Sequence, residues 1–513
     1  MKLKLKVLAL ILAALSVFSV FAACDASGTS ENTTTSAGNG YETTEPTEGQ
    51  TAEQTAEQTT GQASEQTTGQ TSEQTTEVTP DVPDIEKKNY DDIFYLYLEG
   101  SCNPIDNYWV EESGNDVLSA ALFARQEDIL NHLGVELYAW HNTEEDYSSA
   151  FKTAVKTKSG AIDLMMTHVS INVAGLVSDG YLTKFNDIPE IDLDADYWNQ
   201  DFMESLAIDD MYFLGFNDFN ILYTYVIAFN KTLLEKYDDV LDKSIYQMVD
   251  DHEWTIDKMI DLAKVAYIDN GSVEKNQYGF TGLQWVPWCG FLEGCGINLV
   301  EMNDQGNYEV SFYNAQTKDK TIALVGKLKD LAASDYACVD YWSFEITVPF
   351  TTNRALMTLS STNQLTEYLH YDIDFGIVPY PLFDSNQTEY HSLQWGGYLA
   401  IPAYFEDEEM VGETIEMLAY YSDGVKVAFY QKLLGKQVAD NPDDRHMLEI
   451  VWDSVCTDFG QTFENASNDM LYMLPYVTSA TSGYELTSYY DSNAQSANKS
   501  LENFVKRVVK KNK

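Results

Sequence analysis

Short apolar segments alternate with amphipathic ones from residue 90 onward. The apolar run Ile93–Leu98 lies between acidic and glycine-containing segments, which is typical of a buried parallel strand. Apolar residues then recur at helical spacing from Leu118 to Leu133, between an Asn115 cap signal and Gly134. The alternation continues with a strand over 135–140, a helix opening at 143–146 and a strand over 163–167. This order predicts an α/β fold whose parallel sheet has helices on both faces and binds ligands beyond its carboxyl edge.

The segment that precedes this pattern has a different composition. Residues 25–84 are rich in Thr, Glu, Gln, Ser and Gly, and from Thr51 they run in tetrads such as Thr-Ala-Glu-Gln. A period of four without large apolar residues cannot bury a face, so the segment is predicted to be a disordered acidic tether. The folded part is therefore expected to be residues 85–513, which is long enough for two lobes with their own cores.

The N-terminus has the parts of a secretory signal. A positive start is followed by the apolar stretch Val7–Phe21 of 15 residues, which is shorter than the ~20 that a membrane span needs. Residues 21–24, Phe-Ala-Ala-Cys, then resemble a bacterial lipobox. We expect residues 1–23 to be a signal peptide and residues 24–84 to begin with a lipidated Cys24, which would anchor the chain on the extracytoplasmic face of the bacterial cell membrane. The alternative is an ordinary signal peptide cleaved near Ala23.

Charge and cysteine content exclude several classes of function. The chain has 31 Lys and Arg against 81 Asp and Glu, a formal net charge of −50. Such a surface repels phosphate backbones and anionic lipids, so nucleic-acid binding is not expected. Six cysteines in 513 residues do not make a disulfide scaffold. Cys289 and Cys295 are interpreted as small apolar residues, while the disulfide state of all five cysteines beyond Cys24 stays open.

Several motifs of the folded part are those of a known family, in the same order. They are Gly160–Leu164 with Val177–Leu182, Ala228–Lys231, Trp254–Asp257, Phe350–Met357, Phe375–Pro381, and Gly396–Tyr398 with Ile401–Pro402. Together they resemble the extracellular solute-binding proteins of ABC importers, in the sugar-binding, maltose-binding-protein-like branch. The resemblance covers about residues 90–460 and is nearest to lipoproteins of Gram-positive anaerobes. One departure is Asn353, at a position where the family usually has Gly.

The resemblance implies a two-lobed periplasmic-binding-protein-like fold that encloses its ligand by hinge closure. Lobe one would comprise about 90–218 and 398–450, and lobe two about 219–395 and 451–513. It also implies a monomer without catalytic residues, metal ion or cofactor, which passes a small-molecule ligand to the transmembrane subunits of an ABC permease.

A carbohydrate site needs aromatic rings for the sugar's C–H face and planar polar groups for its hydroxyls. The candidate stacking residues are Trp285, Trp288, Trp395 and Tyr398, and Trp395 directly precedes Gly396 and Gly397. The polar candidates and Tyr223 follow predicted strands or lie near the first crossing between lobes: Ser101, Asn103, Thr167, His168, Asn217, Asp218, Tyr223, Ser361, Thr362 and Asn363. Relatives often have an aromatic residue at the position of Asn363. Few Lys or Arg occur among them, which favours a neutral carbohydrate, although Asp218 and the acidic field leave a peptide or a polyamine open.

The main alternative is a surface-anchored glycosidase. Any two of 81 carboxylates could be paired on paper, so the composition does not support this reading without geometry. No G-x-S-x-G or H-E-x-x-H motif occurs, and the S-x-x-K match at Ser149–Lys152 lacks an accompanying S-D-N. Asp269–Ser272 hints at a calcium loop but lacks its spacing, and is predicted to be a turn.

Overall fold

The computed structural model describes residues 82–99, 103–142, 147–340, 344–438, 441–479 and 481–513. Residues 81–513 form one compact unit. The predicted signal peptide, Cys24, most of the tether and Ser101 lie outside the described residues.

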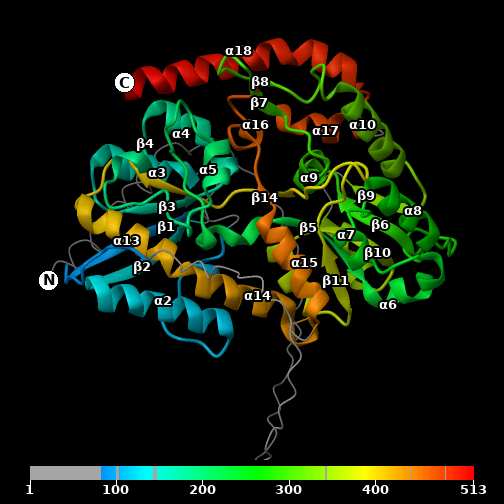
Figure 1. Cartoon of the computed structure of the whole chain (residues 1–513), viewed down its shortest axis with the longest axis horizontal. Helices are drawn as coiled ribbons and strands as arrows, with labels where there is room; N and C mark the ends of the chain where they lie inside the picture. The colour runs from blue at the N-terminus through cyan, green and yellow to red at the C-terminus, as the bar shows by residue number, and fades with distance from the viewer. Residues whose placement is uncertain (1–81, 100–102, 143–146, 341–343, 439–440, 480) are drawn as a thin grey trace, which may run out of the picture. The chain divides into compact units, whose positions relative to one another are not determined.

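The first sheet has the strand order β2-β1-β3-β13-β4 (Figure 1). β1 pairs in parallel with β2 and β3, whereas β13 is antiparallel to β3 and β4. The strands are β1 (Asp92–Glu99), β2 (Val135–Asn142), β3 (Leu164–Thr167), β4 (Leu182–Thr183) and β13 (Tyr398–Pro402). This sheet and its helices α2 (Val117–Leu133), α3 (Tyr147–Thr157) and α4 (Val173–Asp179) are called lobe one below.

The second sheet has the order β11-β5-β10-β6-β9. β10 is parallel to β6, and β6 to β9, but β5 is antiparallel to both β10 and β11. The strands are β5 (Tyr225–Asn230), β6 (Tyr278–Leu283), β9 (Ala337–Asp340), β10 (Ala355–Ser361) and β11 (Phe375–Val378). With its helices this sheet is called lobe two. Both sheets are therefore mixed. The predicted parallel arrangement is confirmed for β1, β2 and β3, and the distant strand β13 adds an antiparallel neighbour to this sheet.

The helices of lobe two, and a small separate hairpin, lie between the strands of the second sheet in the sequence. They are α6 (Lys231–Leu234), α7 (Ile245–Asp250), α8 (Ile256–Ala266), α9 (Val286–Gly294), α10 (Lys318–Ala332), α11 (Val348–Thr351) and α12 (Thr362–Tyr368), with the hairpin β7 (Val300–Met302) and β8 (Tyr308–Val310). In lobe one, α5 (Gln200–Ser205) precedes the first crossing to lobe two.

Two chain segments that cross between the lobes are tied together by hydrogen bonds. The first contains the 3-10 helix η4 (Asp218–Tyr223) and the second contains β12 (Ser392–Leu393), beside which lies β14 (Val455–Cys456). β12 pairs in parallel with β14, and Thr224 is bridged to Gln394. The Asn220 side chain also donates to the Gly397 carbonyl oxygen. The crossings thus form one connected strip between the sheets.

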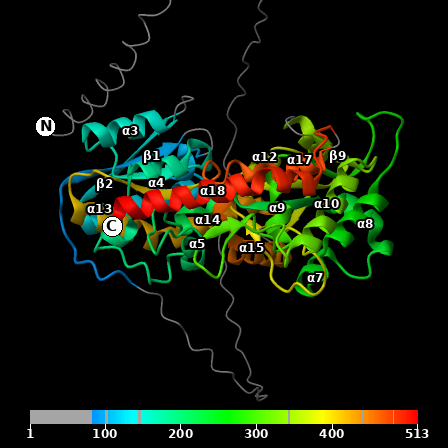
Figure 2. The ribbon, with the colours of Figure 1, turned by 90° about the horizontal axis from the view of Figure 1, so that it is seen from above.

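The C-terminal third of the chain supplies the remaining helices. They are α13 (Glu408–Tyr420), α14 (Ser422–Val438), α15 (Pro442–Asp453), α16 (Phe459–Thr462), α17 (Met473–Thr478) and α18 (Leu486–Asn512). α14 packs on α2 of lobe one, whereas α15 packs on β11 of lobe two. Figure 2 shows α5 and α15 on one side of this unit, with α3 and α12 on the opposite side.

Local backbone geometry explains two sequence features. Helix α2 ends at Gly134, as predicted, in the left-handed region (φ 66°), but its N-cap is Asp116 and not Asn115. Asn353 also has a positive φ of 56°, a conformation that favours Gly and that Asn tolerates better than most other residues. Its Nδ2 donates to the Asp372 carbonyl oxygen at 2.8 Å, which holds the turn before β11.

Two further predictions are confirmed. Asp269–Ser272 forms a turn, in which the Asp269 carboxylate accepts the Gly271 N–H at 2.8 Å. Cys289 and Cys295 are buried free thiols, and burial raises the pKa of Cys295 to about 12, so both act as small apolar residues.

Candidate ligand-binding site

Trp395 lies in the second crossing, against His168 at the end of β3. Its backbone N–H donates to the Tyr223 carbonyl oxygen at 3.1 Å, and its ring centroid is 6.2 Å from that of His168. The next residue, Gly396, has φ 87°, and a Cβ there would collide with the His168 ring. Only glycine allows the crossing to run this close to His168.

The two lobes contribute together to this place. The His168 ring is 6.4 Å from that of Tyr223, and the Asn363 Nδ2 donates to the Tyr223 hydroxyl at 3.3 Å. Asn363 lies in the first turn of α12, directly after β10 of lobe two. Four of the predicted site residues, His168, Tyr223, Asn363 and Trp395, are therefore brought into contact. They are called the Trp395 cluster below.

The Trp395 cluster is largely enclosed and contains no cationic side chain. Trp395 is 8% exposed and His168 3%. Burial lowers the pKa of His168 to about 4, although its hydrogen bond with Trp395 opposes this shift. The imidazole is therefore neutral at pH 7 and can offer one donor and one acceptor nitrogen.

The other polar candidates of this region mainly support the backbone. Ser361 caps α12 by accepting the Gln364 N–H at 3.3 Å, and the Thr362 N–H donates to the Thr224 carbonyl oxygen. The carbonyl oxygen of buried Thr167 accepts the Gly397 N–H at 3.0 Å. The Oδ1 of buried Asn103 accepts the Tyr108 hydroxyl at 3.1 Å. These residues fix the strand ends on which the cluster stands.

The remaining aromatic candidates separate by burial. Trp288 is 0% exposed and Tyr398 1%, so neither ring has a free face in this arrangement of the lobes. The Trp288 Nε1 donates to Thr478 at 3.0 Å inside the core of lobe two. Trp285 is only half-buried and stacks on Tyr472, with ring centroids 4.3 Å apart and planes at 16°.

Tyr472 was not among the sequence candidates. It is the last residue of η7 (Met470–Tyr472) and the N-cap residue of α17, and its hydroxyl donates to the Glu464 carboxylate at 3.1 Å. Burial raises the pKa of Glu464 to about 7. The signal that could have indicated Tyr472 is its spacing of four residues from Tyr476 at the start of a helix.

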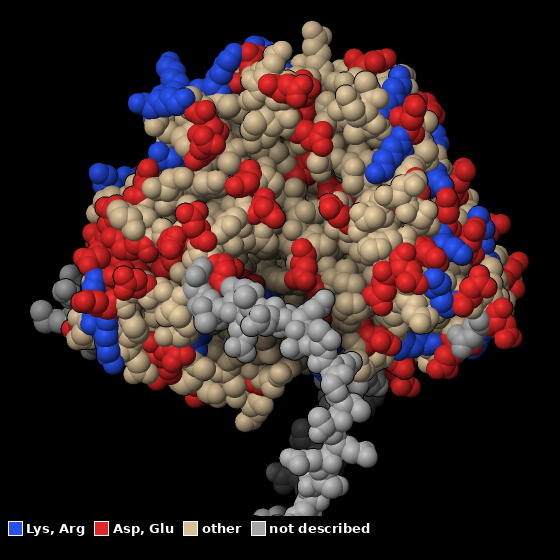
Figure 3. Space-filling model, in the orientation of Figure 1, with Lys and Arg blue, Asp and Glu red and all other residues tan. Residues whose placement is uncertain are grey.

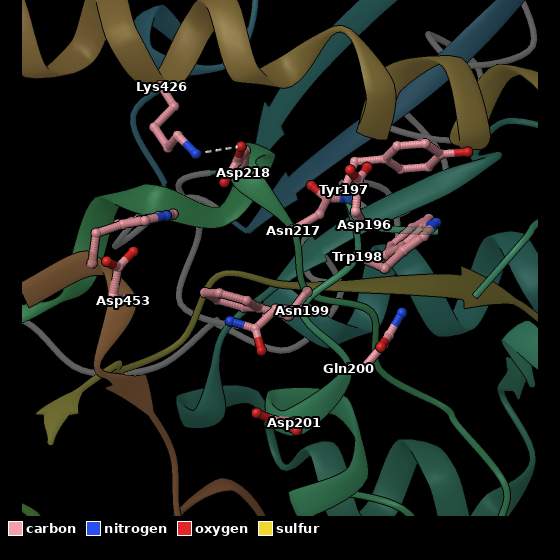
Figure 4. A pocket seen from close by; sticks show the side chains of 12 residues that line it. Asp196, Tyr197, Trp198, Asn199, Gln200, Asp201, Asn217, Asp218, Lys426 and Asp453 are labelled. Carbon is pink, nitrogen blue, oxygen red and sulfur yellow. Dashed lines mark ion pairs between the residues drawn. The ribbon is translucent and has the colours of Figure 1, made fainter. Parts of the chain in front are cut away.

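Asn217 and Asp218 line a separate cavity of about 380 Å³. Residues at the start of α5, in the first crossing, near the start of α14 and at the end of α15 surround it (Figure 4). Asp218 pairs with Lys426 of α14 at 2.7 Å. Burial raises the pKa of Asp218, and Lys426 opposes that shift.

Neither the acidic surface nor the site shows a metal centre in the part of the chain that the structure describes. No group of three or more His, Cys, Asp or Glu side chains there is arranged to hold a metal ion. In the same described residues, no helix combines the length and apolar character required to span a membrane.

Comparisons with known proteins agree with this architecture. A family model described as bacterial extracellular solute-binding protein matches residues 131–425. The GacH receptor of Streptomyces glaucescens, solved unliganded and with acarbose and an acarbose homolog, is 16% identical, with 81% of this chain and 98% of that chain covered and a TM-score of 0.50. An ABC transporter solute-binding protein from Thermotoga lettingae, bound with α-D-tagatose, is 13% identical and has a TM-score of 0.52. The match covers 80% of this chain and 100% of that chain. No curated protein sequence matches the chain. The predicted two-lobed α/β fold is confirmed.

Proposed function

Because the chain belongs to the bacterial extracellular solute-binding proteins, we propose that it captures a neutral oligosaccharide and delivers it to the permease of an ABC importer. The observation that carries this proposal is the Trp395 cluster, in which an aromatic crossing residue meets polar side chains from both lobes. A ligand held by His168 of lobe one and Asn363 of lobe two would be bound best when the lobes are together. Hinge closure is the motion that this arrangement requires.

The chemistry of the cluster favours a neutral polyhydroxylated ligand. The Asn363 amide and the Tyr223 hydroxyl can each donate and accept hydrogen bonds, as sugar hydroxyls do. The neutral His168 imidazole uses one ring nitrogen in its hydrogen bond with Trp395, which leaves the other ring nitrogen for a ligand hydroxyl. The half-buried pair of Trp285 and Tyr472 adds a second aromatic surface in lobe two. Two aromatic surfaces suit a ligand of more than one sugar ring, and the two structural relatives described above were solved with acarbose and with tagatose.

A thermal-shift screen of the full chain against acarbose, maltotriose and tagatose tests the proposal. A ligand present at 100 times its Kd is expected to add about 2.7 kcal/mol to the free energy of unfolding. Analysis of the sugars after incubation separates binding from catalysis. Stabilisation with intact sugar supports a binding protein, whereas release of shorter sugars would favour the surface-anchored glycosidase. Stabilisation by polyamines and by no sugar would contradict the choice of ligand class.

We further propose that Cys24 carries the lipid anchor and that residues 25–84 tether the folded unit to the membrane. Support comes from the apolar stretch followed by Ala22-Ala23-Cys24. Changing Cys24 to Ala is expected to move the protein from the membrane fraction into the medium, or to leave an uncleaved precursor, because two acyl chains are needed for stable anchoring. Fractionation and intact mass spectrometry measure both. Equal membrane retention of Cys24→Ala and wild type would contradict anchoring at this residue.

A further inference from the structure

The C-terminal helix α18 packs against elements of both lobes. It is 27 residues long, and it contacts β8 on the side of lobe two and α4 on the side of lobe one. Figure 1 shows it running from the neighbourhood of α17 and α10 to that of α4, and Figure 2 shows the same course from above. A single rigid element is thus attached to two bodies that the proposed function requires to move.

The first half of α18 is held on lobe two mainly by apolar contacts. The ring of Tyr490 lies 5.6 Å from that of Phe312 and 4.9 Å from that of Tyr313. The Asn498 Oδ1 accepts the Val310 N–H of β8 at 2.8 Å. The buried residues of this half are Leu486, Tyr489, Ala494 and Ala497. Leu501 and Phe504, which follow before the last two turns, are also buried, and the Phe504 ring lies against those of Phe459 and Phe463. Burial of this many apolar side chains makes the part of α18 before its last two turns the more firmly attached one.

The last two turns of α18 are held on lobe one largely by charge. Arg507 pairs with Asp179, the last residue of α4, and Lys513 pairs with Asp209 at 2.6 Å. Lys511 donates to the Asp179 carbonyl oxygen, which lies at a helix C-terminus where carbonyl groups carry a partial negative charge. Val508 adds one fully buried apolar side chain.

These charge contacts are exposed and therefore separable. Arg507 is 63% exposed and Asp179 45%, and pairs of this kind are weak and screened by salt. Basic side chains gather where α18 ends, at the upper left of Figure 3, on a protein whose acidic residues far outnumber its basic ones. Opposite charges at this one place connect the helix to lobe one.

We propose that α18 is a latch between the lobes. Its first half stays with lobe two, and its last two turns release lobe one when the lobes move apart, because the weaker of two attachments on a rigid helix breaks first. The fraction of ligand-free protein with separated lobes is therefore set by the contacts of Arg507, Lys511 and Lys513. The inference concerns lobe motion and is independent of which ligand is bound.

The distance between the lobes in the ligand-free full chain tests the latch. Glu127 of α2 and Lys258 of α8 are both exposed and can be replaced by a keto amino acid that carries a spin label. Pulsed electron paramagnetic resonance then measures the distance between the two labels. Arg507→Asp is expected to raise the ratio of separated to closely placed lobes about threefold, the size of effect that an exposed ion pair gives. Raising the salt concentration from about 0.02 M to about 0.5 M is expected to have a similar effect on the wild type and little on the variant.

A matched variant on the same helix provides the control. Lys499→Asp makes the same change in net charge, but Lys499 pairs with Glu502 within α18 at 2.6 Å, so the interlobe distance should stay that of the wild type. Asp179→Arg added to Arg507→Asp should restore the wild-type distribution. A folded Arg507→Asp protein with wild-type distances would overturn the latch, as would an equal effect of Lys499→Asp. If Arg507→Asp melts much earlier than wild type, Arg507→Gln takes its place with the same expectation.

Discussion

Replacing Trp395 with alanine is expected to lower the free energy of unfolding by about 3–5 kcal/mol, the range for large buried aromatic side chains. Trp395 is only 8% exposed and belongs to the buried core. The substitution would also remove the ring against which His168 lies, at a centroid distance of 6.2 Å. Affinity for a sugar ligand should therefore fall at least tenfold, or about 1.4 kcal/mol. Denaturant unfolding and calorimetric titration with acarbose measure the two effects separately.

Trp288 offers the matched control for this prediction. It is equally a buried tryptophan, but it lies within lobe two, where its Nε1 donates to Thr478 at 3.0 Å. Trp288→Ala should cost a similar amount of stability and leave the affinity of the remaining folded protein unchanged. If either alanine variant is mostly unfolded, the corresponding phenylalanine variants allow the same comparison. Equal sugar affinity in Trp395→Phe and Trp288→Phe would show that the Trp395 cluster is not the binding site.

The elements of lobe one could be predicted because each has a local signal. The run Ile93–Leu98 lies within β1, whose last six residues are buried, and Gly134 ends α2 with a left-handed backbone. The cap was misplaced by one residue because Asn115 and Asp116 are both good N-cap residues. The structure selects Asp116, whose carboxylate accepts the Ser119 N–H at 3.1 Å.

Strand direction could not be predicted in the same way. β13 lies between β3 and β4 although it comes from residues 398–402, and it runs antiparallel to both. Buried strands of either direction have similar apolar runs, so a local pattern does not show which neighbours a distant strand will have. The same limit applies to β5, which is antiparallel between β10 and β11.

Part of the candidate site could be predicted from the sequence where glycines indicate a constraint on the backbone. Gly396 and Gly397 both have positive φ, which explains why two glycines follow Trp395 at this turn of the backbone. The contact with His168 depends on tertiary packing, which the glycines do not encode. The positions of Asn217 and Asp218 could not be predicted in this way. Which side of a crossing segment a residue faces depends on the register of that segment, and no local pattern shows the register. The structure places both residues at the cavity near α5 and α15.

The pH dependence of stability is expected to change when His168 is replaced by Gln. The pKa of His168 is lowered by burial from 6.5 to about 4 in the folded protein. Between these two values the unfolded chain binds a proton that the folded protein excludes, so His168 stabilises the fold fully above pH 6.5 and loses this contribution as the pH falls towards 4. At 1.36 kcal/mol per unit, the loss is about 3 kcal/mol.

Other buried groups change the free energy of unfolding with pH in the opposite direction. The informative measurement is therefore the difference in this free energy between two variants. Burial raises the pKa of Glu464 to about 7 and that of Asp458 to about 6. Each contributes stability that is present at low pH and is lost as the pH rises through these values. The difference in free energy of unfolding between wild type and His168→Gln cancels these terms. Urea unfolding between pH 4 and 8 should show the wild type losing about 3 kcal/mol relative to His168→Gln on acidification. A difference that does not vary with pH would mean that the imidazole is not protected from protonation and that the Trp395 cluster is open to water.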